Sequence, residues 1–183
     1  MDEFQVIKQV ISGNKQAFEK LVLRYQTPLL LYLGRMGMVQ AEAEDMAQET
    51  FIRAFRHLGR FDPQQAQFST WLFTIARRLG INAMARRRVK TYSLEDSEAA
   101  LDLSYTDRYD DGATIKRRIN EALLQLPMKY RSPIALAYLG DLGMADIARV
   151  EGCSVGTVKS RIHRGKKRLR EMLTDLIGDN DYA

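Results

Sequence analysis

Apolar residues recur every three or four positions along most of the chain, which is the spacing of one face of an α-helix. The pattern runs through residues 12–37, 38–61 and 67–90 and, after an interruption, through 114–178. No stretch alternates apolar and polar residues as a half-buried strand would. The pattern therefore predicts an all-α protein.

The periodicity fails between Thr91 and Ala113, where the chain becomes rich in Ser, Thr and Asp. Residues 91–114 carry 7 acidic side chains and 1 basic one. Such a composition is typical of a linker that cannot bury a core. We therefore expect two small helical domains, at residues 1–90 and 115–183, joined by a flexible acidic linker at residues 91–114.

The linker lies between two basic segments. Residues 61–90 carry 6 basic side chains and 1 acidic one, and residues 115–183 carry 13 basic and 8 acidic side chains. The whole chain has a net charge of +5. Two separate basic segments indicate two contacts with a polyanion, for which nucleic acid is the simplest choice. The alternative is that these charges only solvate exposed helix faces.

The second basic segment contains "LGMADIARVEGCSVGTVKSRIHRGKKRL", residues 142–169, which has the character of a helix-turn-helix. The apolar residues of its first short helix should face inward. Gly152 supplies a turn residue that tolerates a positive φ, and Ser154 can cap the following helix. The stripe of that helix is then Val155, Val158, Ile162 and Leu169.

Many hydrogen-bond donors lie off this stripe: Thr157, Lys159, Ser160, Arg161, His163, Arg164, Lys167 and Arg168. Lys and Arg can bond to guanine edges and phosphates, and Ser and Thr to either. A helix with one buried stripe and donors elsewhere fits the major groove of DNA. The alternative is an ordinary terminal helix whose cations favour its negative C-terminal end.

A second candidate surface lies in "AEDMAQETFIRAFR", residues 43–56. Asp45, Gln48 and Glu49 fall close together on one helical surface. Paired carboxylates can serve acid–base chemistry, but the sequence shows no metal-ligand cluster, nucleophile constellation or Gly-rich phosphate loop beside them. We expect no enzyme, no cofactor and no metal; a protein-docking face and a plain solvated face remain equally open.

The segment 61–90 combines a polar loop, aromatic residues and arginines. Proteins hold single-stranded nucleic acid by stacking bases on aromatic rings beside a cationic track. Phe61, Phe68 and Trp71 could stack, but Trp71, Ile75 and Leu79 also have the spacing of a core stripe. We therefore expect Trp71 to be mainly a core residue that could brace the preceding loop.

The compartment follows from simpler features. The chain has a single cysteine, Cys153, which excludes an internal disulfide and fits a reducing environment. The acidic N-terminal stretch "MDEFQVIKQV" has no apolar signal region, and no apolar run is long enough to span a bilayer. We expect a cytoplasmic protein without membrane insertion.

Four blocks in order, "GNKQAFEKLVLRYQ", "AEDMAQETFIRAFRHLGRF", "FSTWLFTIARR" and "GCSVGTVKSRIHRGKKRLREML", resemble bacterial sigma factors of the extracytoplasmic-function (ECF) group. The resemblance implies a non-enzymatic factor that binds core RNA polymerase and directs transcription initiation at promoter DNA. It also implies a dedicated anti-sigma factor. The alternative is a stand-alone helix-turn-helix regulator that binds duplex DNA without polymerase.

The resemblance assigns roles to residues of this chain. It places the contact with the β′ clamp coiled coil of polymerase on Asp45, Gln48, Glu49, Phe51 and Arg53. It places minus-ten promoter contacts on Phe61, Asp62, Gln67, Phe68, Ser69, Thr70, Arg77, Arg78, Asn82 and Arg86. It places minus-thirty-five contacts on Ser154, Thr157, Lys159, Ser160, Arg161, His163, Arg164 and Lys167. Arg78 departs from the asparagine that is common in the family.

Overall fold

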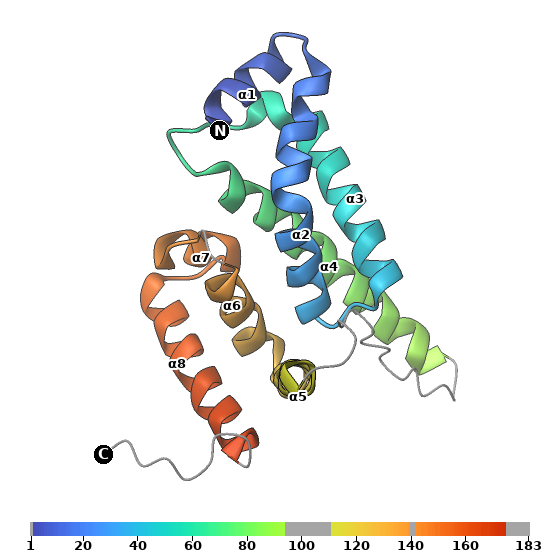
Figure 1. The fold of residues 1–183 in the computed structure, drawn as a ribbon, viewed down its shortest axis with the longest axis vertical. Helices are drawn as coiled ribbons and strands as arrows, with labels where there is room; N and C mark the ends of the chain where they lie inside the picture. The colour runs from blue at the N-terminus through green and yellow to red at the C-terminus, as the bar shows by residue number, and fades with distance from the viewer. Residues whose placement is uncertain (1, 94–110, 140–141, 175–183) are drawn as a thin grey trace.

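The computed structural model describes residues 2–93, 111–139 and 142–174, and every regular element among them is a helix (Figure 1). The N-terminal part contains α1 (Glu3–Ile11), η1 (Lys15–Phe18), α2 (Glu19–Arg35), α3 (Gln40–His57), η2 (Leu58–Arg60) and α4 (Phe68–Ser93). The C-terminal part contains α5 (Asp111–Gln125), α6 (Met128–Tyr138), α7 (Met144–Glu151) and α8 (Val155–Met172). The predicted all-α class with two helical domains is confirmed.

The N-terminal domain is organised around α2, which packs against both α3 and α4. The buried residues of α2 recur at helical spacing and are Leu21, Tyr25, Leu29, Tyr32 and Leu33. Each such side chain contributes about 1.5–3 kcal/mol when it leaves water. This stripe fixes which face of α2 points inward, and the helix runs through Pro28 without a break.

The packing of α4 against the connection between α2 and α3 needs a small residue. A Cβ on Gly80 would come within 3.1 Å of the methyl carbons of both Met36 and Met38. In the same connection Gly37 has a φ of +100°, which other residues rarely adopt. Gly80 thus lets α4 lie close to the α2–α3 turn, and Gly37 gives that turn its positive φ.

The C-terminal domain is built on α6, which packs against both α7 and α8. The approach of α8 is set by Gly165, because a Cβ there would meet Ile134 Cδ1 at 2.4 Å. Between α7 and α8, Gly152 has a φ of +65°, and Ser154 accepts a hydrogen bond from the backbone N–H of Thr157 at 3.2 Å. The turn glycine and the serine cap predicted for the helix-turn-helix are both confirmed.

The two domains pack against each other. Helix α4 lies on α7, and α2 lies on α6 and α5 (Figure 1). Buried apolar residues of both domains form one continuous cluster, which extends from Val6 to Ile162. At the predicted linker, 91–114, α4 continues to Ser93 and α5 begins at Asp111, so both ends of that range are helical. The rest of the range lies outside the described residues.

Candidate functional site

The exposed face of α8 carries the donors that the sequence predicted for it. Lys159, Ser160, His163, Arg164 and Lys167 are exposed, whereas Val158 and Ile162 are buried against the rest of the domain. Ser154 is exposed as the N-cap, and Thr157 is partly buried beside it. One predicted member of the buried stripe is wrong: Val155, in the first turn, is 38% exposed. The remaining face presents cations to solvent along the length of the helix.

An aromatic cluster lies where the loop after α3 meets α4. The ring of Trp71 is 5.4 Å from that of Phe61 and 5.9 Å from that of Phe68, between ring centroids. Trp71 is partly buried, and Phe68 is 2% exposed. Trp71 therefore packs on the core through Phe68, as its spacing indicated, and contacts Phe61 of the preceding loop.

The loop itself is shaped by Asp62. Its carboxylate accepts hydrogen bonds from the backbone N–H of Gln64 and from the side chain of Gln65, both at 2.9 Å. Helix α4 starts at Phe68, and the N–H of Trp71 donates to the carbonyl of Gln67. Local hydrogen bonds thus hold the loop in one shape.

The residues predicted for minus-ten contacts differ in how far they are buried. Phe68, Ser69 and Thr70 are each 2% exposed, so their side chains face the interior. Phe61 and Arg77 are partly buried. The exposed members are Asp62, Gln67, Arg78, Asn82 and Arg86. The available surface is therefore one loop edge and one side of α4.

A buried carboxylate joins the two domains. The side chain of Glu151, at the end of α7, is fully buried and faces Arg77 of α4. Arg77 Nε donates to Glu151 Oε1 at 3.0 Å, and Arg77 Nη2 donates to Oε2 at 3.2 Å. Arg161 of α8 approaches the same carboxylate at 3.5 Å. A paired arginine fork is the geometry in which a buried carboxylate is best stabilised.

The carboxylate also ends a hydrogen-bonded chain that crosses the domain boundary. Ser132 Oγ donates to Glu151 Oε1 at 2.5 Å. Because the Ser132 hydroxyl has only one proton, the Tyr32 hydroxyl must donate to Ser132 Oγ, at 2.9 Å. Burial raises the pKa of Tyr32 well above its usual range, so it remains a donor at neutral pH. Glu151, Ser132, Tyr32 and the two arginines form what we call the Glu151 network.

A second polar contact lies beside this network. Thr70 Oγ1 donates to Asp146 Oδ1 at 3.0 Å, and Arg149 pairs with the same oxygen at 3.1 Å. Sequence reasoning missed Glu151, Ser132, Tyr32 and Asp146 as partners of the predicted DNA-binding residues. No local pattern reveals them, since Arg77 and Glu151 are 74 positions apart.

The predicted polymerase-docking face lies on α3. Asp45, Gln48 and Arg53 are exposed, and Arg53 Nε donates to Glu49 Oε1 at 2.6 Å. Phe51 differs, because it is 8% exposed and packs edge-on against Phe18, with ring centroids 6.5 Å apart. Four of these residues form a surface, and Phe51 supports that surface from the core.

Two absences among the described residues bear on other functions. No group of three or more His, Cys, Asp or Glu side chains there is placed to hold a metal ion. None of the helices described is long and apolar enough to cross a membrane.

Comparisons with known proteins match both domains. The family model for Sigma-70 region 2 matches residues 21–90, and that for Sigma-70, region 4 matches residues 116–169. The ECF RNA polymerase sigma factor SigW of Bacillus subtilis is 37% identical and is aligned over 93% of this chain and 96% of its own. The RNA polymerase sigma-H factor of Pseudomonas aeruginosa is 34% identical over 94% of both chains.

Two solved structures are similar in fold. CnrH in complex with the cytosolic domain of CnrY has a TM-score of 0.68 at 27% identity, covering 93% of this chain and 96% of CnrH. The sigma factor RpoE in complex with the anti-sigma factor NepR, from Bartonella quintana, has a TM-score of 0.69 at 26% identity. That match covers 86% of this chain and 96% of RpoE.

Proposed function

We propose that this chain, which belongs to the sigma-70 family of RNA polymerase sigma factors and to its ECF group, contacts its promoters through α8 and α4 and its polymerase through α3. It is a sigma factor for promoter recognition by RNA polymerase and not an enzyme. The observation that carries the residue assignment is the exposed face of α8. Its donors stand free of the buried stripe, at the spacing that a major-groove helix needs.

The polymerase contact is assigned to the exposed part of α3. Asp45, Gln48 and the Glu49–Arg53 pair form a mixed polar surface with no role in the core. Such a surface suits the β′ clamp coiled coil, because exposed charges steer encounter and set register between helices. Phe51 and Phe18 hold α3 against the domain and keep this surface rigid.

The minus-ten contacts are assigned to the loop edge at Asp62 and Gln67 and to Arg78, Asn82 and Arg86 of α4. A base that has left the stack can bind in a shaped pocket, while cations follow the backbone of the strand. The aromatic cluster of Phe61, Phe68 and Trp71 supports the loop from behind. Its role is to fix the loop rather than to stack on a base.

Promoter binding on both elements requires the domains to separate. Arg77, Thr70 and Arg161 are predicted DNA contacts, yet each is engaged between or beside the domains in this structure. The packed arrangement is therefore a closed state. Polymerase favours the open state by binding the two domains at separate places, and a ligand shifts such an equilibrium only by its differential affinity for the two states.

We infer the regulation and the cellular compartment of this chain from the similar solved structures. Both similar structures are complexes with a second protein, one described as an anti-sigma factor and one as a cytosolic domain. We assign an anti-sigma factor to this chain as well, together with a cytoplasmic location beside the polymerase.

The test is run-off transcription from a promoter library by purified core polymerase, with and without the protein. Promoter-specific transcripts should appear only when the protein is present. The double variant Gln48→Ala, Glu49→Ala should lose core binding while the full chain keeps its affinity for minus-thirty-five duplex. Gln26→Ala, an exposed glutamine on α2, is the matched control. Core binding retained by the double variant would contradict the docking assignment.

A further inference from the structure

Helix α6 carries two tyrosines that the assigned promoter contacts do not use. Tyr130 lies in the first turn of α6 and Tyr138 is its last residue, and the helix packs on α8 (Figure 1). The packing is close, because the Cβ of Tyr130 lies 3.2 Å from where a Cβ on Gly165 would stand. Tyr138 is 62% exposed, so its ring has no role in the core.

Each of these tyrosines lies beside a cation of α8. The guanidinium carbon of Arg168 is 4.9 Å from the ring centroid of Tyr130, and Nζ of Lys166 is 5.3 Å from that of Tyr138. Lys129 of α6 places a second cation 5.1 Å from the ring centroid of Tyr130. Because an aromatic ring attracts a cation over its face, the two tyrosines hold Arg168 and Lys166 near defined positions.

The charge beside Tyr130 is not balanced by acids. Arg164, a predicted minus-thirty-five contact, also lies beside the Tyr130 hydroxyl. Burial would raise the pKa of this hydroxyl, but the charges of Lys129 and Arg168 lower it instead. Within the described part of the chain, neither these three cations nor Lys166 pair with an acidic side chain. Such a surface attracts an anion from outside the protein.

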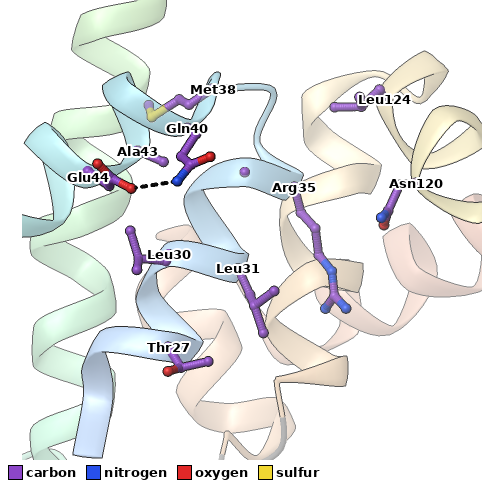
Figure 2. A pocket seen from close by; sticks show the side chains of 11 residues that line it. Thr27, Leu30, Leu31, Arg35, Met38, Gln40, Ala43, Glu44, Asn120 and Leu124 are labelled. Carbon is purple, nitrogen blue, oxygen red and sulfur yellow. Dashed lines mark hydrogen bonds between the residues drawn. The ribbon is translucent and has the colours of Figure 1, made fainter. Parts of the chain in front are cut away.

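The pocket between α2, α3 and α5 differs from this surface. Arg35 lines that pocket, but so do the acid Glu44 and the apolar side chains of Leu30 and Leu31 (Figure 2). Its lining is therefore mixed and selects no single kind of charge. The surface between α6 and α8 offers cations and a tyrosine hydroxyl, which are donors that proteins use to contact DNA phosphates.

The two cations of α8 point to opposite sides of the helix. Lys166 and Arg168 are two positions apart, which is about 200° around an α-helix. The face between them is buried against α6 at Gly165, and the opposite face, with Ser160 and Lys167, is exposed. When the exposed face enters the major groove, Lys166 and Arg168 therefore stand at its two rims, where the backbones of the two strands run.

The length of α6 agrees with this placement. Tyr130 and Tyr138 are eight positions apart in one helix. Eight residues correspond to about 12 Å along a helix axis, and the major groove is about 12 Å wide. The cations beside the two tyrosines are thus spaced for the two walls of the groove.

We propose that α6 and α8 form a phosphate bracket around the major groove of the minus-thirty-five duplex, with Lys166 on the backbone of one strand and Arg168 on that of the other. Lys129 and the Tyr130 hydroxyl join Arg168, while the rings of Tyr130 and Tyr138 are positioning groups. The bracket fixes the register of α8 in the groove and carries no sequence information. It rests on the proposed function, since α8 must bind the minus-thirty-five element.

The first test is the salt dependence of duplex binding by the full chain. Lys166→Ala and Arg168→Ala should each reduce the slope of log K against log [KCl] by about 1, because each removes one phosphate contact. Both should weaken binding to minus-thirty-five and scrambled duplex by the same factor. Lys20→Ala removes an exposed lysine of α2 and is the matched control, with an unchanged slope. A wild-type slope for either α8 variant would overturn the bracket.

The second test locates each contact with duplexes in which one phosphate at a time is replaced by an uncharged methylphosphonate. Each replacement that weakens binding of the wild type but not of Lys166→Ala should lie on one strand. The replacements to which Arg168→Ala has become insensitive should lie on the other strand. Positions on the same strand, or no such positions, would contradict a contact at both rims.

The positioning role is tested at Tyr138. Tyr138→Ala should weaken duplex binding and reduce the salt slope, whereas Tyr138→Phe keeps the ring and should restore both. The melting temperature of the free protein should change little in either variant, because this side chain is exposed. Equal binding by the two variants would remove the positioning role of the ring.

Failure of the bracket and failure of the proposed function give different results. A wild-type chain that does not prefer minus-thirty-five to scrambled duplex would overturn the assignment of α8 and the bracket with it. A preserved preference, together with variants that keep the salt slope and phosphate sensitivity of the wild type, would overturn the bracket alone.

Discussion

Helices α8 and α4 carry similar signals in the sequence but differ in what they can reach. On α8, Lys159 is exposed and makes no ion pair or hydrogen bond with another described residue. On α4, the side chain of Arg77 is 22% exposed and is bound by Glu151 across the domain boundary. A basic residue on a predicted DNA-binding helix is therefore not necessarily available to DNA in the free protein.

The largest effect on the availability of Arg77 is expected when the charge of Glu151 is removed. Glu151→Gln keeps an oxygen for Ser132 but leaves Arg77 and Arg161 without their counter-charge. Loss of one partner of a buried pair is strongly destabilising, so the free energy of unfolding should fall by about 3 kcal/mol. Urea unfolding of the full chain measures this, and distance measurements between spin labels on α4 and α7 should report opening.

The control for that variant is Glu49→Gln. Glu49 pairs with Arg53 on the surface, where ion pairs contribute little, so the loss should be at most about 0.5 kcal/mol. An equal effect of the two substitutions would show that the Glu151 network does not hold the domains together.

The position of α8, and so of its exposed basic face, depends on its close packing against α6. Gly165→Ala adds a Cβ where Ile134 Cδ1 stands 2.4 Å away, so either Ile134 or the helix must move. Overpacking of this kind should lower the free energy of unfolding by about 1–3 kcal/mol. Gly156→Ala on the same helix is the control, since Ser154 Oγ at 3.9 Å is its nearest neighbour. Thermal unfolding should show Gly156→Ala to be neutral or slightly stabilising.

A direct comparison of the two helices uses Lys159→Ala and Arg77→Ala. In the free protein, Lys159→Ala should weaken minus-thirty-five duplex binding about tenfold, because an exposed donor is lost. Arg77→Ala should not lower single-stranded minus-ten binding by the free protein, since that side chain is already engaged by Glu151. The substitution also leaves the buried carboxylate of Glu151 with Arg161 as its remaining arginine, which favours opening of the domains. Within the polymerase complex both variants should lose promoter affinity, as filter binding can measure. A loss for Arg77→Ala in the free protein would contradict the closed state.

The smallest effect is expected at the N-terminus of α8. Ser154→Ala removes the hydrogen bond to the Thr157 N–H and should lower the free energy of unfolding by about 1 kcal/mol. Calorimetry should then record a melting temperature lower by roughly 2–4 °C. Ser160→Ala, on the exposed face of the same helix, should leave the melting temperature unchanged.

Much of the fold was predictable because its causes are local. The helical spacing of apolar residues, Gly152 and the Ser154 cap each act within a few residues, and the structure bears them out. Errors arose where a long-range contact decided the outcome. Val155 fits the apolar stripe by spacing, but no neighbouring helix covers it in the first turn of α8. The residue-level contacts with polymerase and DNA remain proposals.

The sequence by itself determined the helices, the two basic segments and the family to which the chain belongs, because periodicity, charge and motif spacing are properties of neighbouring residues. Only the tertiary structure decided which of those residues are free. Arg77 and Glu151, and Tyr32 and Ser132, meet because one continuous core draws the two domains together. Contacts between residues so far apart in the chain have no local signature that a reading of the sequence could find.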